Sequence, residues 1–523
     1  MLVVCVLLLI LISAAYLFSE RMLINNVAST GTVQRRQAVS LSESGVAYVQ
    51  ASLQSVMAQA TEIEWPSRWN GEVKTSDSDS FGEFQVSYWD ERRDAWKAGV
   101  SDESCKLNLN QLPLDTLYGP EARRMLMCVP GMTLVIADSI LDWMDEDEIQ
   151  REFGAESSYY RTQKPPRFVR NKRLKVLDDL RGVRGVTPKL LYGARKHSQW
   201  EQSPRLADLN PASERSGAGN LALREKDFGF SAFLTVHGGI SVLRMDGEPR
   251  ILINQDDLVS LYDEIMERLG EDVATYLVAY RMFGPKDKTL LATDDYLIDE
   301  VEQTQRRAIR QASDEDEADR ISIPTERKGS LTIDKEGVFL IRSIYDLIGV
   351  DVEYKSKDGS LLIESPWPEN EYTFNKVMPV LNEDLCFLFG TPIMAQVNVN
   401  QAPIEVLRSI PGISDDLVDQ ILITRQTMGI DADSNSAIAR SKQFLQIDWL
   451  RSAGVMNLKQ MRVFAPYITN LGTAFRFIST GISQPSNQSS HQEVVLDFRY
   501  HSGNVAFSNT RSLRETMNVE RGN

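Results

Sequence analysis

Residues 1–18 read MLVVCVLLLILISAAYLF and are apolar apart from Ser13. About 18–20 apolar residues are long enough to cross the hydrocarbon core of a bilayer. A cleavable secretory signal would carry a basic segment before the apolar run and a small-residue cleavage site after it. Here no Lys or Arg precedes the run, and SERMLINN follows it. We therefore expect an anchored chain, with a transmembrane segment over residues 1–19.

The helical pattern continues beyond this apolar run, because residues 20–60 contain no proline. A narrow apolar stripe at helical spacing follows, formed by Val46, Val49, Leu53, Val56, Met57 and Ala60. We expect one helix of about 55–60 residues, ended by Pro66. The next run, FGEFQVSYWD at residues 81–90, alternates as a strand does. Such a helix packed on a sheet is typical of a pilin, and an anchor followed by an unrelated α+β domain is the alternative.

The composition bounds the number of domains and the kind of partner. The chain has 523 residues, of which 42% are hydrophobic and 25% charged, with a net charge of −16. This length predicts several globular domains. An acidic chain repels phosphate backbones, so we do not expect nucleic acid as its main partner.

A short motif occurs three times in the chain. It reads KLNLNQLPLDTLY at 106–118, RILINQDDLVSLY at 250–262 and QVNVNQAPIEVLR at 396–408. In each copy an aliphatic residue stands four positions after the asparagine of the Asn-Gln pair, as in the first turn of a helix. Asparagine is a strong N-cap residue. The sequence therefore predicts three helix N-caps, at Asn110, Asn254 and Asn400.

Each copy continues through a glycine turn into a second helix. The three stretches are VPGMTLVIADSILDWMD at 129–145, RLGEDVATYLVAYR at 268–281 and IPGISDDLVDQILITRQ at 410–426. A third, Asp-Leu element follows near Leu180, Leu347 and Leu450. The turn SIPGIS resembles a helix-hairpin-helix, but Asp415 and Asp416 follow it, and this charge is wrong for phosphate. We expect three helical modules that are structural or bind protein.

Two small clusters could hold a metal ion or a disulfide. Asp142, Asp145, Asp147 and Glu156 form one acidic region, and calcium prefers such oxygen ligands. The spacing is not that of an EF-hand, and a solvated helix end or a network with Arg151 and Arg161 is the alternative. Cys105 and Cys128 are candidates for a disulfide in an oxidising compartment, or else two small core residues.

No pattern of a known enzyme is present in the sequence. The four histidines, His197, His237, His491 and His501, are not at metal-ligand spacing. The sequence contains no G-x-S-x-G, phosphate-binding loop or H-E-x-x-H motif. We expect neither catalysis nor a cofactor other than calcium.

Several stretches together resemble the K minor pseudopilin of type II secretion. Besides the apolar N-terminus and its stem, they are LNLNQLP at 107–113, ILDWMDEDEIQREFGAESSYY at 140–160, RLKVLDDLRGVRGVTPKLLYG at 173–193, FLTVHGG at 233–239, ILINQDDL at 251–258 and VNVNQAPIEVLRSIPGI at 397–413. The resemblance runs in order over residues 1 to about 280 and returns in the third module. It implies an inner-membrane anchor and a periplasmic body. It further implies a pilin-like helix and sheet with a large helical insertion.

The resemblance also implies a non-enzymatic role at the tip of a short pseudopilus. The implied partners are the other minor pseudopilins, the major pseudopilin, the inner membrane and secreted substrates. The sequence departs from the pattern in its third module, its missing leader and its lack of an acid within residues 1–18, where major pseudopilins carry a glutamate at position five. A tip subunit has no neighbour above it for that carboxylate to pair with, so its absence fits. We expect an upstream leader that ends in glycine.

The predicted architecture is α+β, with a pilin helix on a small antiparallel sheet and an inserted, mostly α-helical body. Strand-like runs at 473–482, 493–500 and 504–511, with a polar loop at 483–490, complete the sheet. A membrane-anchored helix-hairpin-helix receptor for DNA is the alternative function. The predicted divisions are 1–19 transmembrane, 20–100 stem and first strands, 101–215 module 1, 216–300 strands and module 2, 301–330 charged linker, 331–395 α/β connector, 396–470 module 3 and 471–523 final strands.

Overall fold

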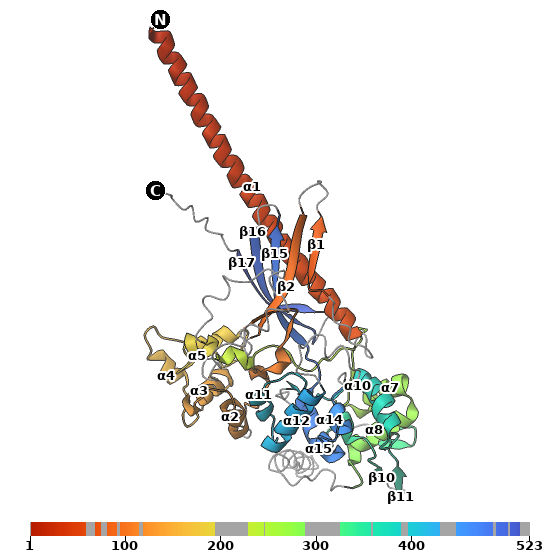
Figure 1. Ribbon diagram of the computed structural model, residues 1–523. Helices are drawn as coiled ribbons and strands as arrows, with labels where there is room; N and C mark the ends of the chain where they lie inside the picture. Colours follow the sequence, from red (N-terminus) through yellow and green to blue (C-terminus); the bar gives the residue numbers. More distant parts are fainter. Residues whose placement is uncertain are drawn as a thin grey trace.

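The computed structural model describes residues 2–58, 68–74, 81–90, 95–114, 119–193, 228–244, 246–287, 325–356, 359–388, 396–428, 446–484, 488–499 and 503–512. In these ranges the chain forms one long helix, an antiparallel sheet along it and a body of short helices beyond the sheet (Figure 1). The α+β architecture expected from the sequence is therefore confirmed. Residue 117, the end of the stem at 60–66 and most of the predicted charged linker lie outside the described residues.

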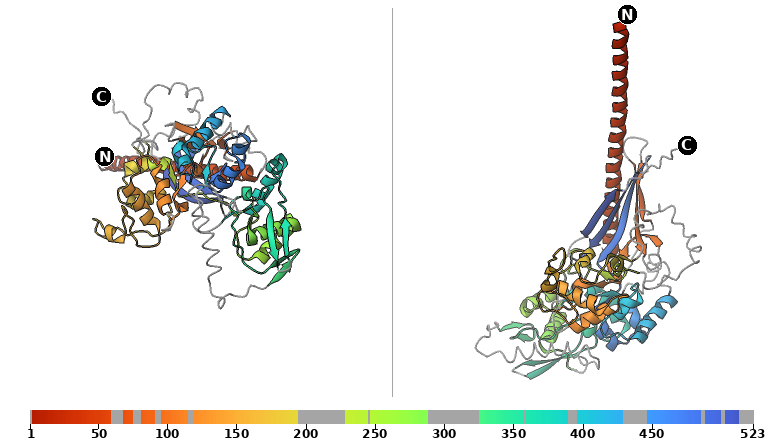
Figure 2. Two further views of the ribbon diagram at one scale, coloured as in Figure 1. Left: turned by 90° about the horizontal axis from the view of Figure 1, so that it is seen from below. Right: turned by 90° about the vertical axis from the view of Figure 1, so that its left-hand side faces the viewer.

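Helix α1 runs without interruption from Leu2 to Ala58. It is long and apolar enough to cross a membrane, and its apolar N-terminal part is exposed. The predicted apolar stripe faces inward where its side chains are described, since Val49 and Leu53 are fully buried. The second view in Figure 2 shows the first half of α1 extending away from the sheet and the body. The helix therefore divides into a projecting apolar half and a packed amphipathic half.

The sheet that α1 packs on is built from both ends of the chain. Its order is β1-β2-β15-β16-β17, with β3 beside β2 and β4 beside β15, and every pairing is antiparallel. The strands are β1 (Asn70–Lys74), β2 (Phe81–Asp90), β3 (Ala95–Ala98), β4 (Ser101–Asp102), β15 (Ala474–Ser483), β16 (Gln488–Asp497) and β17 (Asn504–Ser512). The predicted strands are thus confirmed, and the pilin-like domain is discontinuous.

One predicted loop is shorter than expected. The polar stretch 483–490 supplies the start of β16, because Gln488, Ser489 and Ser490 continue the ladder opposite residues 481–483 of β15. Polar side chains suit the strand end at Gln488 and Ser489, which stay partly accessible, whereas Ser490 is buried. The hairpin between β15 and β16 is therefore tighter than its composition indicates.

Small residues bring α1 close to the sheet. A Cβ at Gly481 would overlap the carbonyl oxygen of Ala38 and the amide nitrogen of Ser42, and a Cβ at Gly45 would overlap the hydroxyl of Ser479. The core between helix and sheet is apolar and consists of Val49, Leu53, Trp69, Phe84, Val86, Val100, Phe475, Phe477, Val494, Leu496 and Phe498. Glycine at both contact points lets the backbones approach to a distance that larger residues would prevent.

Each of the three sequence repeats opens on a two-residue strand and closes on a second one that pairs with it in parallel. The pairs are β5 (Leu107–Asn108) with β6 (Leu234–Thr235), β7 (Ile251–Leu252) with β12 (Leu385–Cys386), and β13 (Val397–Asn398) with β14 (Ile468–Thr469). We use module 1 for residues 107–235, module 2 for 251–386 and module 3 for 397–469. Each module is thus a closed loop of chain.

The helices inside the modules follow the predicted order of helix, glycine turn, helix and Asp-Leu element. The turn glycines Gly131, Gly270 and Gly412 all have positive φ. Module 1 contains η2 (Leu109–Gln111), α2 (Gly119–Met127), α3 (Leu134–Met144), α4 (Ser157–Arg161), η3 (Leu177–Gly182), α5 (Pro188–Tyr192) and η8 (Phe230–Ala232), preceded by η1 (Glu103–Cys105). Module 3 contains α11 (Ile404–Arg408), α12 (Asp415–Thr427), α14 (Trp449–Ser452), α15 (Leu458–Phe464) and η13 (Ala465–Tyr467).

Module 2 extends further than the sequence indicates. It contains α7 (Leu258–Leu269), α8 (Glu271–Phe283), β8 (Glu326–Lys328), β9 (Leu331–Ile333), η10 (Ile344–Asp346), β10 (Val352–Ser356), β11 (Gly359–Ile363), a π-helical turn η11 (Thr373–Val377) and α10 (Met378–Asp384). The stretch 331–395, predicted as a separate connector, therefore lies largely inside module 2. Likewise, the FLTVHGG strand closes module 1 and does not begin module 2. A two-residue closing strand has no periodicity by which the sequence could reveal its partner.

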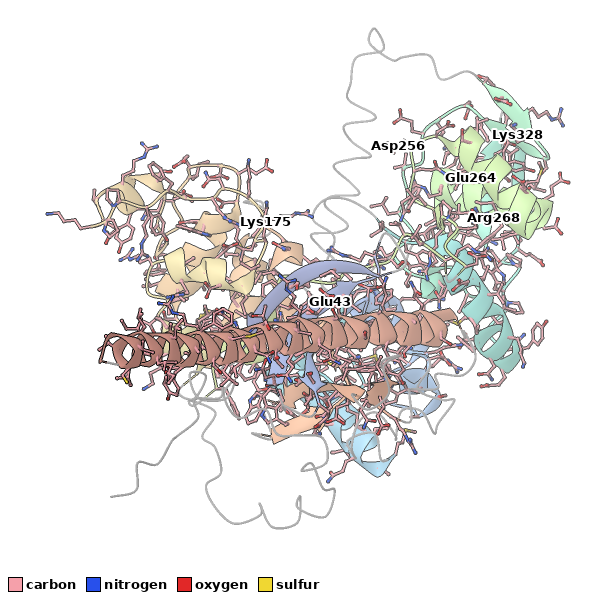
Figure 3. The ribbon with its side chains drawn as sticks, turned by 90° about the horizontal axis from the view of Figure 1, so that it is seen from above. Glu43, Lys175, Asp256, Glu264, Arg268 and Lys328 are labelled. Atoms are coloured by element: carbon pink, nitrogen blue, oxygen red, sulfur yellow. The ribbon has the colours of Figure 1, made fainter. Side chains whose placement is uncertain are left out.

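The modules share one hydrophobic core. The buried apolar residues from Leu107 to Ile468 form a single cluster that runs through all three modules. Module 2 lies to one side of module 3 and module 1 to the other, as Figure 1 shows. In the view from above, in which α1 lies across the picture, the labelled residues Asp256, Glu264, Arg268 and Lys328 mark module 2 (Figure 3). The body is therefore one packed unit.

Candidate functional site

The asparagines at the repeat positions bridge distant segments and do not cap helices. The Asn110 side chain accepts from the Leu174 amide over 2.8 Å and donates to the carbonyls of Leu174 and Val236, both over 2.8 Å. Asn254 repeats this pattern with Ile341, accepting over 2.9 Å and donating over 2.8 Å, and it donates also to the Leu388 carbonyl. Each side chain therefore ties the opening of its module to two later segments.

Asn400 bridges in a related way in module 3. Its side-chain oxygen accepts from the indole Nε1 of Trp449 over 2.8 Å, and its nitrogen donates to the Asn470 carbonyl over 3.2 Å. The N-cap prediction for Asn110, Asn254 and Asn400 is therefore wrong. A side-chain amide can both donate and accept, and these three asparagines use that capacity across the module.

Other residues accept the hydrogen bonds from the free amides where the first turns and helices of the modules begin. The first asparagine of each Asn-x-Asn, Asn108 and Asn398, accepts from the amide two residues later, over 3.0 Å and 2.9 Å. Module 2 has Leu252 at this position, and its helix α7 is capped by Asp257. Helices α7 and α11 begin four residues after the repeat asparagine, as expected, whereas the first α-helix described in module 1 begins at Gly119.

Modules 2 and 3 each bury an arginine under the opening turn. Arg281 is fully buried and donates to the carbonyls of Phe339, Asn254 and Gln255. Burial lowers the pKa of Arg281 to about 10. Arg425 holds the same place in module 3 and donates to the Ala402 carbonyl over 2.7 Å. In these modules, charged hydrogen bonds satisfy the carbonyls of the turn.

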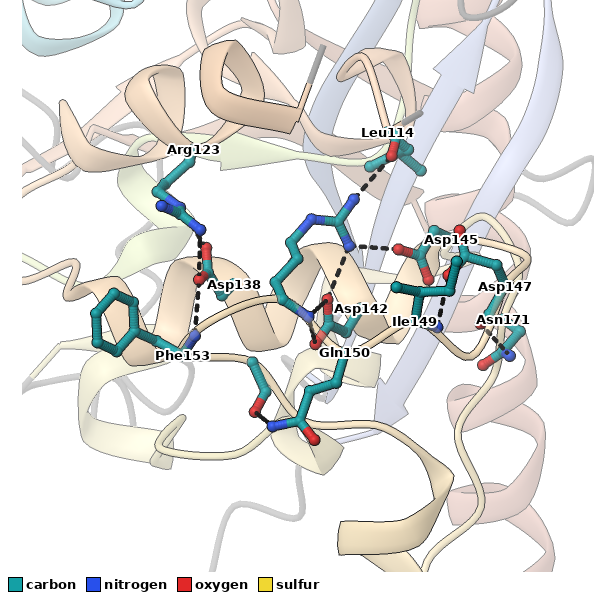
Figure 4. Close-up of polar contacts among 12 residues, drawn as sticks. Leu114, Arg123, Asp138, Asp142, Asp145, Asp147, Ile149, Gln150, Phe153 and Asn171 are labelled. Atoms are coloured by element: carbon teal, nitrogen blue, oxygen red, sulfur yellow. Dashed lines mark hydrogen bonds and ion pairs between the residues drawn. The ribbon is translucent and has the colours of Figure 1, made fainter. Parts of the chain in front are cut away.

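In module 1 the arginine that contacts the opening turn also forms ion pairs with aspartates. Arg151 donates to the Leu114 carbonyl and to Asp142, both over 2.8 Å, and to Asp145 (Figure 4). Nearby, Asp138 of α3 accepts two hydrogen bonds from Arg123 of α2, over 2.6 Å and 2.8 Å. The second pair locks the two helices of the hairpin together. Arg123 and Arg151 thus neutralise part of the negative charge of α3 and the residue after it.

Three of the four predicted metal ligands converge. Asp142, Asp145 and Glu156 are buried, and they offer ligand oxygens that lie within 4.8 Å of one another. Asp145 Oδ1 and both carboxylate oxygens of Glu156 are buried without a hydrogen-bond partner among the described residues. Asp147 stays outside this group, because its carboxylate accepts from the Ile149 amide over 2.7 Å. The alternative network with Arg151 is present as well, whereas Arg161 is exposed.

Burial gives this cluster unusual protonation behaviour. Burial raises the pKa of Asp145 to about 6, against the opposing effect of Arg151. Burial, with the charges of Asp142 and Asp145, raises the pKa of Glu156 to about 8. Three acids and a single guanidinium leave excess negative charge when all are ionised. A divalent cation would remove this excess and would satisfy the free oxygens, so the residues present fit such an ion.

Cys105 and Cys128 do not form the predicted disulfide, because both are free thiols. The Cys105 sulfur lies 3.6 Å from Oε1 of Gln401 in module 3, and the Cys128 sulfur lies 3.5 Å from the Arg124 carbonyl of the preceding helix α2. The two thiols thus have separate partners, and the alternative of small residues within packed surroundings describes them better.

Buried acids join the sheet to the modules. Asp102 of β4 accepts from the Gly472 amide and from the Asn398 side chain, both over 2.8 Å. Glu103 is fully buried and accepts from Arg476 of β15 over 2.9 Å. Burial alone would raise the pKa of Glu103, but Arg476 and Lys106 outweigh it and hold that pKa below its usual range. The first residues of the inserted body are therefore fixed to the last strands of the chain.

Cationic side chains also connect neighbouring modules. Arg124 of module 1 donates to the carbonyls of Arg408, Ser409 and Ile410 at the end of α11. Arg462 of module 3 donates to the carbonyls of Tyr345 and Ile348 in module 2. In both cases a guanidinium meets the negative end of a helical turn. Sequence reasoning missed these arginines because nothing in local spacing reveals a partner in another module.

Comparison with known proteins shows that the chain is similar to components of the type II secretion system. Residues 105–197 match the family model described as type II secretion system (T2SS), protein K. A stretch of 57 residues is 42% identical to "Putative type II secretion system protein K" of Escherichia coli strain K12, and it covers 11% of this chain and 17% of that protein.

A solved structure also aligns over most of the chain. It is the crystal structure of the GspK–GspI–GspJ complex from the enterotoxigenic Escherichia coli type 2 secretion system. The alignment covers 93% of this chain and 100% of the other, at 10% identity and a TM-score of 0.34. That TM-score does not establish a shared fold. The family match covers residues 105–197, and this part of the chain is therefore similar to protein K of the type II secretion system, in agreement with the sequence resemblance.

Proposed function

We propose that this chain is a non-enzymatic minor pseudopilin of a type II secretion system, anchored by α1 in the inner membrane with its body in the periplasm. The observation that carries the proposal is the similarity to protein K at residues 105–197, inserted between strands β4 and β15 of a helix-and-sheet domain. The exposed apolar residues of α1 would contact lipid and the stems of neighbouring subunits.

The arrangement of the body supports a place at the tip of the pseudopilus. The modules lie beyond the sheet, at the end of the molecule away from the start of α1 (Figures 1 and 2). A further subunit stacked above this one would meet three packed modules. A subunit of this shape can begin a fibre but is poorly suited to its middle. The other minor pseudopilins and the major pseudopilin are the partners that this role requires.

The acidic cluster of module 1 supports an additional structural role for a divalent cation, and calcium is the ion we assign to it. Asp142, Asp145 and Glu156 would hold the ion, which would supply positive charge to buried carboxylates. The free, buried oxygens of Glu156 and Asp145 support this assignment. Such an ion would fix the loop after α3 to α4 and would take no part in catalysis.

Coexpression with the other minor pseudopilins tests the proposed function. The full chain, purified in detergent through a tag, should retain the other minor pseudopilins at fixed stoichiometry, and restore secretion in a strain that lacks its own protein K. A control chain with charged residues in place of Leu41 and Val49 should lose both properties, because its stem cannot pack. Tight, salt-sensitive DNA binding on a filter, without complex formation, would overturn the proposal.

A further inference from the structure

One segment of module 1 has a charge opposite to that of the rest of the chain. Residues 161–189 contain ten Lys and Arg residues and two Asp residues, a net charge of +8 in a chain of net charge −16. We call residues 161–189 the basic segment. Nine of its ten cationic side chains are exposed, namely Arg161, Lys164, Arg167, Arg170, Lys172, Arg173, Lys175, Arg181 and Lys189. Charge asymmetry of this kind marks an interaction surface.

The backbone of the basic segment is fixed in place although most of it is neither helix nor strand. Arg167 donates through its guanidinium to the Gly182 carbonyl over 3.0 Å, and its amide donates to the Tyr160 carbonyl over 3.0 Å. Asn171 donates to the Asp147 carbonyl over 3.1 Å. Leu174 is held on both its amide and its carbonyl by Asn110, the bridging residue of the repeat. The loop is therefore preorganised by three anchor points.

Four cations next to these anchors form no polar contact of their side chains inside the described part of the molecule. The side chains of Lys164, Lys172, Arg173 and Lys175 take part in no hydrogen bond or ion pair within the described part of the chain, and Figure 3 shows Lys175 extending outward from module 1. The two acids of the segment are occupied, since Asp178 and Asp179 pair with Arg181 and Arg170.

An exposed aromatic ring lies among these cations. Phe168 is 81% exposed and stands between Arg167 and Arg170 in the chain. Arginine and aromatic side chains are enriched at protein interfaces, and an ordered loop loses little conformational entropy on binding. This combination of a rigid backbone, free cations and an exposed ring is suited to recognition of another macromolecule.

The position of the segment and the charge around it restrict the partner. Module 1 lies at the end of the molecule away from the start of α1 (Figure 2), so the basic segment is remote from lipid held by that helix. A long polyanion such as DNA would pass beyond the segment onto the acidic remainder of the chain and be repelled. A compact acidic patch on a folded protein meets only the segment, because charges beyond about 8 Å are screened at physiological salt.

We propose that the basic segment, with its free cations Lys164, Lys172, Arg173 and Lys175, is a docking surface for an acidic protein, with the exposed Phe168 as an apolar contact. Binding of this kind is a property of the isolated chain. It goes beyond the proposed function, and its failure would leave the assignment as a minor pseudopilin unaffected.

A charge-reversal series tests this proposal with the full chain in a neutral detergent. The probe is a fluorescein-labelled oligoglutamate peptide, and fluorescence anisotropy reports binding. The triple variant K172E/R173E/K175E should lower the affinity by about tenfold or more. The matched control K286E/K376E/K459E makes the same change in net charge at exposed lysines of modules 2 and 3, and its affinity should stay within about twofold of the original.

Two further readouts complete the test. The affinity of the unchanged chain should fall steeply as salt rises, since the attraction is electrostatic, and vesicles of anionic phospholipid should bind less well than the peptide. Equal losses in both triple variants, binding to anionic vesicles alone, or no binding of the peptide would overturn the proposal. If K172E/R173E/K175E fails to fold, the neutralising variant K172Q/R173Q/K175Q takes its place, with a matching loss expected.

Discussion

The hydroxyl of Ser479 on β15 donates a hydrogen bond over 2.7 Å to the main-chain carbonyl of Ser42 on α1. This bond is buried between the long helix and the sheet, and it joins positions near the two ends of the chain. A second hydroxyl on the same strand, that of Ser483, donates to the side chain of Gln37 over 2.7 Å. Because a buried hydrogen bond is lost if the helix slides, the two bonds fix the register of α1 along β15.

Replacement of Gly481 by alanine should destabilise this contact. The added methyl would meet backbone atoms of Ala38 and Ser42, which cannot move without displacing α1. We expect a loss of about 1–3 kcal/mol in the free energy of unfolding of the helix-and-sheet domain. Thermal unfolding of the full chain in detergent, followed by circular dichroism, measures the effect.

The control for this prediction is Gly31→Ala, at the point where α1 reaches the end of the sheet. A Cβ there would lie 3.8 Å from its nearest neighbour, the Gln488 side chain, at ordinary contact distance. Alanine also favours helix over glycine by about 1 kcal/mol. An equal loss of stability in both variants would show that the close approach at Gly481 is not the cause.

Replacement of Asn110 by aspartate distinguishes a bridge from an N-cap. Aspartate caps helices as well as asparagine does, so a capping residue would tolerate the change. As a bridge, Asn110 would lose both donated hydrogen bonds and place a charge against the carbonyls of Leu174 and Val236. We expect a loss of about 2–4 kcal/mol in stability and faster hydrogen exchange around residue 174.

Asn457 provides the matched control for this change. It caps α15 by accepting from the Gln460 amide over 2.9 Å, with Gln460 completing a capping box. Asn457→Asp should therefore change stability by less than about 0.5 kcal/mol. Tolerance of aspartate at both positions would contradict the bridging role.

The acidic cluster should make stability depend on pH when no divalent cation is present. The folded-state pKa values of Asp145 and Glu156 are raised to about 6 and about 8, above the values near 4 of an unfolded chain. The folded state thus binds more protons than the unfolded state between about pH 4 and pH 8. Stability should accordingly fall as pH rises through this window, with a slope of up to about 1.4 kcal/mol per pH unit for each such proton.

Glu156→Gln should flatten this dependence between about pH 6 and pH 8, because the amide cannot ionise, whereas the contribution of Asp145 below about pH 6 should stay. Urea unfolding of the chain in detergent at a series of pH values, with EDTA present, measures the slope. Asp147→Asn is the control, since Asp147 lies outside the converging group and an amide oxygen can still accept from the Ile149 amide. A slope between about pH 6 and pH 8 that persists in Glu156→Gln would place the titrating group elsewhere.

Millimolar calcium should raise the melting temperature of the chain above pH 7. Binding to the folded state at about 100 times Kd adds about 2.7 kcal/mol, which corresponds to a shift of several degrees. The shift should be lost in Glu156→Gln and kept in Asp147→Asn. Differential scanning fluorimetry with calcium, magnesium and EDTA measures it, and an unchanged melting temperature would exclude the cation site.

Much of the architecture could be predicted from local patterns. The apolar run and stripe predicted α1, the alternation at 81–90 predicted β2 to the residue, and the repeats predicted three modules with their glycine turns. These features depend on the periodicity of apolar residues and on the conformational preferences of residues close together in the sequence. The inward side of the stem at Val49 and Leu53 also follows from spacing alone.

The parts that could not be predicted depend on contacts between distant segments. Asparagine at a helix start is usually a cap, and only the positions of Leu174, Ile341 and Trp449 reveal the bridges. The sulfur of Cys105 faces Gln401 of another module, which no spacing indicates. Among the predicted metal ligands, Asp147 accepts a hydrogen bond from the Ile149 amide and lies outside the cluster. Glu156 lies beside Asp142 and Asp145 because the loop after α3 folds back onto that helix.

The parallel pairing of opening and closing strands has a consequence for how such a chain can change in evolution. The first and last strands of a module lie side by side. The segments before and after a module would therefore keep their positions whether one more module is present or absent. Duplication of a whole module is therefore tolerated more easily than growth inside one. The size of this protein can increase in steps while the membrane helix and its sheet stay the same.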